Sequence, residues 1–474
     1  MTDDRVYFFD TTLRDGAQTQ GVDFNPVDKE FIARELDRVG MDYIEGGWPG
    51  ANPTDDDFFS NLPPLKRSKL VAFGMTRRPG RSTENDPGLT ALISAGTQSV
   101  CMVGKSWDLH VDVALKINRD ENVTMISDSV RYAAGKLDEV IFDAEHFFDG
   151  YKSNSEFALR CVMAAYDAGA RWVVLCDTNG GTLPHEIEEI VAEVCKQVPG
   201  KHIGIHTHDD TGNAVANSLA AVRAGARQVQ GTLNGLGERC GNANLISIIP
   251  TLVLKMDYET NVHAGDLEKL THLSRMVDER LNRAPNRGAP YVGESAFAHK
   301  GGLHVSAVEK DPRTYEHIDP DVVGNERRVL VSDLAGRSSV AHKAEQFGID
   351  MTDRADELAT VLSEIKQLES SGFQFEGAEA SLELLMRKDL KKKTRFFRLV
   401  EFRVIDEKPS EDEHSRSEAS VRIEGPDGKP EHTVASGNGP VNALDSALRK
   451  ALNAFFEVLA AHTIADLEFA NGGR

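Results

Sequence analysis

Short runs of apolar and β-branched residues recur along the first half of the chain, and longer segments with helical spacing separate them. Continuous apolar runs bounded by turn residues are typical of strands buried in a parallel sheet. The intervening segments, such as Lys29–Val39 and Phe157–Ala168, repeat apolar residues at helical spacing, and several end in a helix-stop glycine. Eight strands are predicted: Val6–Phe9, Tyr43–Ile44, Leu70–Phe73, Ser99–Val103, Glu139–Phe142, Trp172–Leu175, His202–Ile205 and Gln228–Gly231.

Eight strands alternating with helices over about 250 residues predict a (β/α)8 TIM barrel, because that is the usual length of this fold. A doubly wound open sheet is the alternative, although it has no natural use for eight near-equal repeats. In a barrel, functional groups lie at the carboxyl ends of the strands. Polar residues follow six predicted strands, at Asp10–Asp15, Glu45, Asp143–His146, Asp177–Gly181, His206–Asp210 and Asn234–Asn242, whereas strands three and four end less suggestively at Met75–Arg77 and Gly104–Lys105.

The pattern changes after Asp257. Leu267–Leu281 is predicted to be an amphipathic helix, helical material continues to Leu385, and the basic run Lys388–Lys393 marks a boundary. Beyond it the sequence predicts strands and one helix, in the order Arg395–Ile405, Glu418–Glu424, His432–Ser436 and Val441–Ala461. We therefore expect an α/β barrel at residues 1–265, helical linker subdomains at 266–388 and a small α+β domain (β-β-β-α) at 389–474.

Composition narrows the class of protein. The 474 residues are 40% hydrophobic and 27% charged, which is ordinary for a soluble globular chain. A net charge of −21 argues against nucleic acid or an anionic membrane as the main partner. Five scattered cysteines without a C-x-x-C pair suit a reducing compartment. Neither a secretory signal peptide nor a membrane-spanning apolar run is predicted, so we expect a cytoplasmic protein.

The motif His206-Thr207-His208 ends the seventh predicted strand. Residues two apart on a strand point to the same face, so the two imidazoles converge. With Asp15 from the end of the first strand they form a plausible ligand set for Mg, Mn, Zn or Co. Asn242 is a candidate fourth ligand, although a glycine-flanked asparagine also suits a turn. The alternative is that the histidines are rim residues that hydrogen-bond to loops.

Other polar residues at the strand ends suit the chemistry of an anionic substrate. Arg14 can bind a carboxylate or oxyanion, or form a surface salt bridge. Glu45, Glu145 and Glu238 are each candidates for a general base, for support of another group or for a structural role. Thr178 can donate to a substrate carboxylate or cap the next helix.

Four motifs together resemble the family of 2-isopropylmalate, homocitrate and citramalate synthases, from about Val6 to Ala461. They are Asp10–Gln18, His206–Asp210, Gly235–Ala243 and His299–His304. Three segments look most like the citramalate synthase branch: Asp10–Phe24, Glu45–Pro49 and Phe142–Lys152.

The resemblance implies an acyltransferase of isoleucine biosynthesis, in which the acetyl group of acetyl-CoA condenses with pyruvate to give (R)-citramalate and CoA. It implies a divalent metal on Asp15, His206, His208 and Asn242. Further implied roles are alkoxide stabilisation by Arg14, carboxylate binding by Thr178, substrate binding by Gln18 and Glu45, proton abstraction by Glu145, and catalysis by His304 and Tyr315.

In the family the linker region covers the active site of the partner subunit, so the resemblance also implies a homodimer with swapped linkers. Relatives under feedback control carry two β-β-β-α halves in their regulatory domain. Only one half is visible in this sequence, so we expect isoleucine inhibition to be weak or absent.

Three other functions remain open at this point. One is a 2-isopropylmalate synthase that uses 2-oxoisovalerate, because a few methylenes in the acceptor pocket discriminate by only about 1–3 kcal/mol. The second is an aldol-type lyase such as HMG-CoA lyase, which shares the barrel and the H-x-H motif. The third is a barrel that has lost its activity and serves in binding or assembly.

Overall fold

The eight predicted strands form one closed parallel barrel in the computed structural model, which describes residues 4–330, 336–350, 354–389, 396–408 and 416–455. The barrel closes where β8 pairs with β1, with Gln228 opposite Tyr7. The predicted TIM barrel is therefore confirmed. Its strands are β1 (Tyr7–Asp10), β2 (Tyr43–Gly47), β3 (Lys69–Met75), β4 (Ser99–Lys105), β5 (Glu139–Glu145), β6 (Trp172–Asp177), β7 (Ile203–Thr207) and β8 (Gln228–Gly231).

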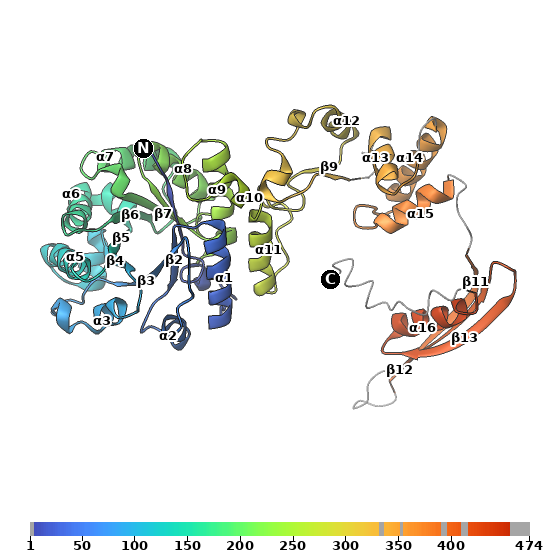
Figure 1. Ribbon diagram of the computed structural model, residues 1–474, viewed down its shortest axis with the longest axis horizontal. Coiled ribbons are helices and arrows are strands. Elements are labelled where there is room, and N and C mark those ends of the chain that lie inside the picture. Colours follow the sequence, from blue (N-terminus) through green and yellow to red (C-terminus); the bar gives the residue numbers. More distant parts are fainter. Residues whose placement is uncertain (1–3, 331–335, 351–353, 390–395, 409–415, 456–474) are drawn as a thin grey trace. The chain divides into compact units, whose positions relative to one another are not determined.

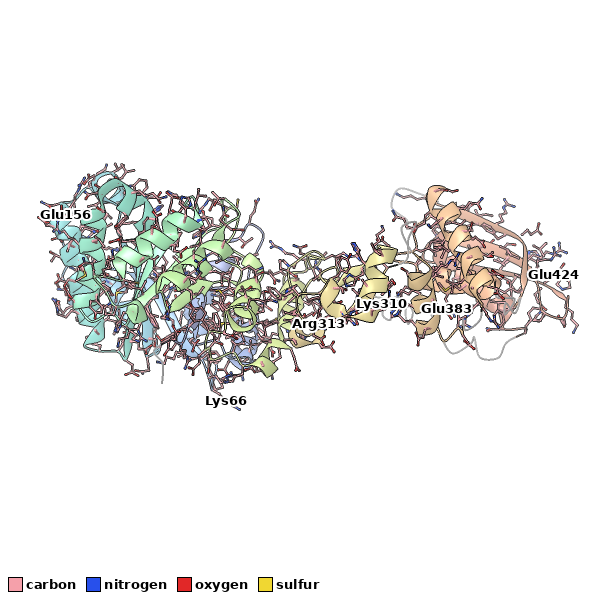
Figure 2. The ribbon with its side chains drawn as sticks, turned by 90° about the horizontal axis from the view of Figure 1, so that it is seen from above. Lys66, Glu156, Lys310, Arg313, Glu383 and Glu424 are labelled. Atoms are coloured by element: carbon pink, nitrogen blue, oxygen red, sulfur yellow. The ribbon has the colours of Figure 1, made fainter. Side chains whose placement is uncertain are left out.

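Helices enclose the strands, as Figure 1 shows. Charged side chains such as Lys66 and Glu156 lie on the outside (Figure 2). The helices of the barrel are α1 (Pro26–Val39), α2 (Pro53–Ser60), α3 (Pro87–Ile93), α4 (Asp108–His110), α5 (Arg119–Ala134), α6 (Phe147–Asp167), α7 (Pro184–Val194), α8 (Ala214–Ala224) and α9 (Leu245–Leu254), followed by α10 (Ala264–Leu267) and α11 (Leu270–Arg280).

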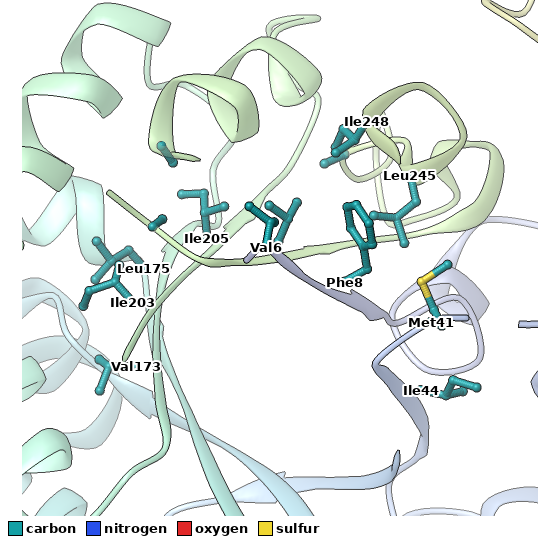
Figure 3. Packing of buried hydrophobic residues seen from close by; sticks show 14 of the residues in the cluster. Val6, Phe8, Met41, Ile44, Val173, Leu175, Ile203, Ile205, Leu245 and Ile248 are labelled. Carbon is teal, nitrogen blue, oxygen red and sulfur yellow. The ribbon is translucent and has the colours of Figure 1, made fainter. Parts of the chain in front are cut away.

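Alternate residues of the strands supply two separate cores. Phe8 points outward and packs near Leu245 of α9, in the layer between strands and helices (Figure 3). Its neighbour Phe9 points inward and joins a second cluster in the barrel interior with Trp172 and Val174. This two-residue alternation is the geometry of a strand covered on both faces, and it explains why most of the strands carry apolar residues on both faces.

Several strands extend further toward their carboxyl ends than the apolar runs indicate. β4 continues to Lys105 and β5 to Glu145, because the pairing of the two strands continues through that position. The candidate functional groups at these positions consequently stand on hydrogen-bonded strands rather than on loops.

Two helices differ from prediction. α6 begins at Phe147, ten positions before the predicted Phe157, but it is interrupted at Asn154, whose backbone is not helical. The Asn154 side chain accepts a hydrogen bond from the backbone nitrogen of Phe157 at 3.1 Å, so a local cap marks the predicted start. The predicted helix Leu267–Leu281 corresponds mainly to α11. Its first residue, Leu267, is instead the last residue of α10, a separate short helix whose N-cap is His263.

The segment after α11 completes the first compact unit, residues 1–330. β9 (Ala298–His299) pairs in parallel with β10 (Arg328–Val329), and α12 (Gly302–Lys310) lies between them in sequence. Glu316 joins the two strands, because it contacts His299 at 3.0 Å and accepts two hydrogen bonds of 2.6 Å from Arg327.

The second compact unit, residues 331–474, contains two separate clusters of elements. The first consists of α13 (Arg337–Gln346), α14 (Ala355–Ser370) and α15 (Glu379–Asp389). The second is the antiparallel sheet β11 (Arg398–Glu407), β12 (Arg416–Glu424) and β13 (Pro430–Gly437) with α16 (Pro440–Leu452). The predicted β-β-β-α order is confirmed.

The last helix ends at Leu452, before the predicted Ala461, and residues 456–461 lie outside the described residues. The same holds for residues 390–393 of the predicted boundary run. The division into 1–265, 266–388 and 389–474 stays a prediction. No helix within the described ranges has the length and apolar character needed to cross a bilayer.

Candidate active site

Asp15, His206 and His208 converge at the carboxyl ends of β1 and β7. Oδ2 of Asp15 lies 3.2 Å from Nε2 of His206 and 3.9 Å from Nε2 of His208, and the two Nε2 atoms are 3.3 Å apart. All three residues are buried. Two imidazole nitrogens and a carboxylate oxygen aimed at one point form a fitting donor set for a divalent ion.

Asn242 joins this cluster from the loop after β8. Its Nδ2 donates to Oδ2 of Asp15 at 2.7 Å and lies 3.2 Å from Nε2 of His206. Its Oδ1 is buried without a partner among the described residues, so the amide also offers an unused oxygen. Only glycine fits at position 237 of this loop, because a Cβ there would lie 1.9 Å from that oxygen. The absence of a side chain at Gly237 lets the loop approach Asn242.

The electrostatics of the cluster favour the metal-binding forms of Asp15 and His208. Burial raises the pKa of Asp15, but Arg14 and the two histidines outweigh it and hold that pKa well below its usual range. Burial and the neighbouring His206 lower the pKa of His208 to about 4. Burial lowers the pKa of His206, and the hydrogen bond and charge of Asp15 raise it by more. At neutral pH Asp15 is a carboxylate and His208 a neutral imidazole.

Arg14 lies between two carboxylates. Its Nε donates to Oε2 of Glu45 at 2.7 Å, and its Nη1 is 3.1 Å from Oδ1 of Asp15. The guanidinium stacks on the ring of Phe73, with 3.9 Å between Cζ and the ring centroid. Glu45 also accepts from the Thr11 hydroxyl at 2.6 Å, and its side chain is fully buried. The guanidinium is thereby held in one orientation beside the cluster.

Glu145, the last residue of β5, forms an ion pair with Lys105, the last residue of β4. Both side chains are about one-fifth exposed and line a cavity of about 580 Å³ at the ends of β2 to β5. Trp48, Val103 and Met125 also line this cavity. The cavity is large enough for part of a cofactor-sized ligand.

Thr178 follows β6 and faces the residue after Glu145. The backbone nitrogen of His146 donates to Oγ1 of Thr178 at 2.9 Å. His146 has a positive φ of 55°, and this turn directs its N–H to the threonine. Oγ1 accepts this hydrogen bond and donates none to the described residues, so the hydroxyl hydrogen of Thr178 can meet another acceptor.

The side chains of three predicted site residues make no contact with this cluster among the described residues, although the backbone nitrogen of Gln18 donates to the carbonyl oxygen of Asp15 at 3.0 Å. Gln18 is exposed at the end of the short 3-10 helix Gly16–Gln18. His304 and Tyr315 are exposed in the segment after α11, and their rings contact one another at a tilt of 30°, with centroids 4.2 Å apart.

Two contacts of the site were not predicted from the sequence. Lys105, at the end of β4, was not predicted as a site residue, although strand pairing places it beside Glu145. Gln230, inside β8, accepts a hydrogen bond from Nδ1 of His206 at 2.8 Å. Matching the last residues of neighbouring strands indicates the first contact, whereas the second depends on the closed barrel.

Known families match the chain in three consecutive segments. Residues 5–277 match the family described as HMGL-like, and residues 291–372 match the homocitrate synthase post-HMGL domain-like family. Residues 376–465 match the LeuA allosteric (dimerisation) domain.

Individual relatives extend over nearly the whole chain. The (R)-citramalate synthase of Aquifex aeolicus is 53% identical and covers 96% of this chain and 86% of that protein. That of Geobacter sulfurreducens is 52% identical and covers 95% and 85%. A 2-isopropylmalate synthase of Sulfurisphaera tokodaii is more distant, at 36% identity over 78% of this chain and 92% of that protein.

Among solved structures, an HMG-CoA lyase from Bacillus subtilis has a TM-score of 0.52 at 22% identity, over 61% of this chain and 97% of that chain. This likeness concerns the fold of the barrel alone. With the three family matches in order and five citramalate synthases at 45–53% identity, the chain belongs to the citramalate synthase branch of the 2-isopropylmalate and homocitrate synthase family.

Proposed function

We propose that this condensing enzyme is an (R)-citramalate synthase, which joins the acetyl group of acetyl-CoA to pyruvate and releases CoA. The observation that carries the proposal is the convergence of Asp15, His206 and His208 at the same rim of the barrel as Glu145. Relatives named (R)-citramalate synthase support pyruvate as the acceptor.

Asp15, His206 and His208 would hold a divalent ion, with Asn242 as a further ligand. Mg, Mn, Zn and Co all suit these nitrogen and oxygen donors. When bound, such an ion supplies Lewis-acid polarisation of the keto group of pyruvate.

Arg14 and Thr178 orient and stabilise the acceptor. The fixed Arg14 guanidinium donates to the oxygen of pyruvate that becomes an alkoxide, where a preorganised donor is most effective. The free hydroxyl hydrogen of Thr178 donates to the pyruvate carboxylate. Glu45 acts through Arg14, and Gln18 binds substrate at the edge of the site.

Glu145 removes a proton from the methyl group of acetyl-CoA, and its carboxylate becomes a carboxylic acid. The resulting enolate carbon forms a bond to the keto carbon of pyruvate, whose π electrons move to oxygen. That alkoxide takes up the proton that Glu145 removed, which returns Glu145 to its carboxylate form. Water then cleaves the thioester, which gives citramalate and CoA. Lys105 holds Oε2 of Glu145 through their ion pair, so Oε1 of the oriented carboxylate takes the proton.

His304 and Tyr315 complete the site from the partner subunit of a homodimer with swapped linkers. The segment that matches the LeuA allosteric (dimerisation) domain supports an oligomer. Weak or absent inhibition by isoleucine stays a prediction.

The test is CoA release from acetyl-CoA by the metal-loaded protein, with pyruvate and 2-oxoisovalerate as separate acceptors. We expect chelator-sensitive release with pyruvate and none with His206→Ala. Preference for 2-oxoisovalerate would contradict the acceptor but keep the chemistry. Release that survives both the chelator and the His206→Ala substitution would contradict the metal site.

A further inference from the structure

One buried amide connects the candidate metal site to the interior of the barrel. Gln230 of β8 lies directly opposite His206 of β7 in the strand pairing, and its side chain is fully buried. Nδ1 of His206 is 2.8 Å from Oε1 of Gln230, and Nε2 of Gln230 donates to Oδ1 of Asp143 at 3.1 Å. Asp143 belongs to β5, so this chain of hydrogen bonds crosses the barrel interior.

The chemistry of these groups determines the direction of every bond. A carboxylate only accepts, so the amide nitrogen of Gln230 faces Asp143 and its oxygen faces His206. Asp143 also accepts from the thiol of Cys101. Because the Gln230 oxygen can only accept, Nδ1 of His206 carries the hydrogen. In the neutral imidazole the lone pair of His206 then lies on Nε2, the atom that points toward Asp15.

The second histidine has no equivalent support among the described residues. Nδ1 of His208 is buried without a hydrogen-bond partner there. The two imidazoles are therefore held differently, although they share one motif. Groups that hydrogen-bond a metal-binding histidine fix its tautomer and ring orientation, and their loss typically lowers metal affinity by about 10–100-fold.

We propose that Gln230 and Asp143 are positioning residues that fix His206 with Nε2 available to a divalent ion and thereby set the metal affinity of the site. The proposal rests on the proposed metal site. It assigns no contact with substrate to either residue.

The test is the affinity of the full-length protein for Co²⁺, measured by competition with a chromogenic chelator and by the visible absorption of bound Co²⁺. Gln230→Met keeps the side-chain length and removes both hydrogen bonds, so we expect Co²⁺ affinity to fall by about 10–100-fold. The matched control is Gln228→Met, two residues earlier on the same face of β8. Gln228 is equally buried, and its side-chain polar atoms lack partners among the described residues. The Co²⁺ affinity of Gln228→Met should therefore match that of the wild type.

A second test exchanges the amide at position 230 and the carboxylate at position 143, so it does not depend on the folding of Gln230→Met. Gln230→Glu alone places a second carboxylate against Asp143 and should weaken Co²⁺ binding. Adding Asp143→Asn restores a donor facing an acceptor, while the carboxylate introduced at position 230 still accepts from Nδ1 of His206. We expect the double variant to recover affinity to within about threefold of the wild type.

The outcomes separate this proposal from the proposed function. Wild-type affinity in Gln230→Met, an equal loss in Gln228→Met, or no recovery in the double variant would overturn the positioning role and leave the metal site intact. Absence of Co²⁺ binding by the wild type would overturn the metal site and the positioning role together. Thermal unfolding of the metal-free variants checks that each one folds.

Discussion

Each end of β5 carries a glutamate that pairs with a lysine of another strand, and we expect only the pair at the carboxyl end to matter for catalysis. Lys105 pairs with Glu145 at the carboxyl end, and Lys69 pairs with Glu139 at the amino end at 2.6 Å. Catalytic groups of TIM barrels lie at the carboxyl ends of the strands, whereas the amino ends contribute to stability. Lys105→Met removes the partner that orients Glu145, so we expect kcat/KM to fall by about 10-fold or more.

Lys69→Met is the matched control for this prediction, because it breaks the same kind of ion pair away from the site. It should leave kcat/KM unchanged. Steady-state kinetics with acetyl-CoA and pyruvate decide the comparison, and thermal unfolding reports on folding. Unchanged kinetics in Lys105→Met would show that Glu145 does not depend on its partner.

Asp10 predicts a pH dependence of stability. It is fully buried at the end of β1, and burial is the main cause that raises its pKa from 3.8 to about 7, against hydrogen bonds from Thr12. The folded state therefore binds a proton that the unfolded chain releases between these two values. The contribution of this group to the free energy of unfolding is present below pH 4, declines as pH rises through that window, and is lost above pH 7.

Asp10→Asn cannot ionise, and its amide can still meet the backbone nitrogen and hydroxyl of Thr12. We expect the variant to gain stability relative to the wild type between pH 5 and pH 8, on the order of 1 kcal/mol or a few degrees in Tm. Calorimetric scans of both proteins at the two pH values measure the gain. An identical pH dependence would mean that Asp10 ionises normally in the fold.

At the scale of elements, the loop after β8 packs against Asn242 so closely that it leaves no space for a side chain at Gly237. A Cβ at Gly237 would collide with the Asn242 amide, whereas a Cβ at Gly181, in the loop after β6, would meet nothing within 4 Å. Gly237→Ala should displace Asn242 and lower metal affinity by about 10-fold or more. Gly181→Ala, the same change in another loop of the same rim, should not alter it. Chelator competition measures both, and equal affinities would mean that Asn242 takes no part in metal binding.

The strands were predictable because most of them are buried apolar runs and several of the helices between them end in a stop glycine. The convergence of His206 and His208 followed from the two-residue period of β7, and it is confirmed in the structure. Lys105 and Gln230 were not predictable in the same way. Their partners lie on other strands, and only the closed barrel and its register bring them together. Local periodicity determines which face a side chain occupies, but not which side chain of another strand it meets.

At the scale of the whole molecule, the main question is whether His304 and Tyr315 serve the site of their own chain or that of a partner subunit. Their rings contact one another and are exposed, without contacts to the metal ligands among the described residues of their own chain. Exposed aromatic groups of this kind have low affinity for substrate until another surface encloses them. The proposed symmetric dimer, in which each chain supplies these residues to its partner, would provide that surface.

Heterodimers of two inactive variants distinguish this arrangement from a site formed within one chain. One chain carries His304→Ala, the other carries His206→Ala, and two different affinity tags isolate the mixed dimer. If the linker acts across subunits, one of the two sites combines an intact metal cluster with an intact His304, and about half of wild-type activity returns. If each chain completes its own site, neither site is intact and the mixed dimer stays inactive. A mixed dimer that carries both substitutions on the same chain is the control, since swapped linkers leave it no complete site whereas linkers acting within one chain leave it one.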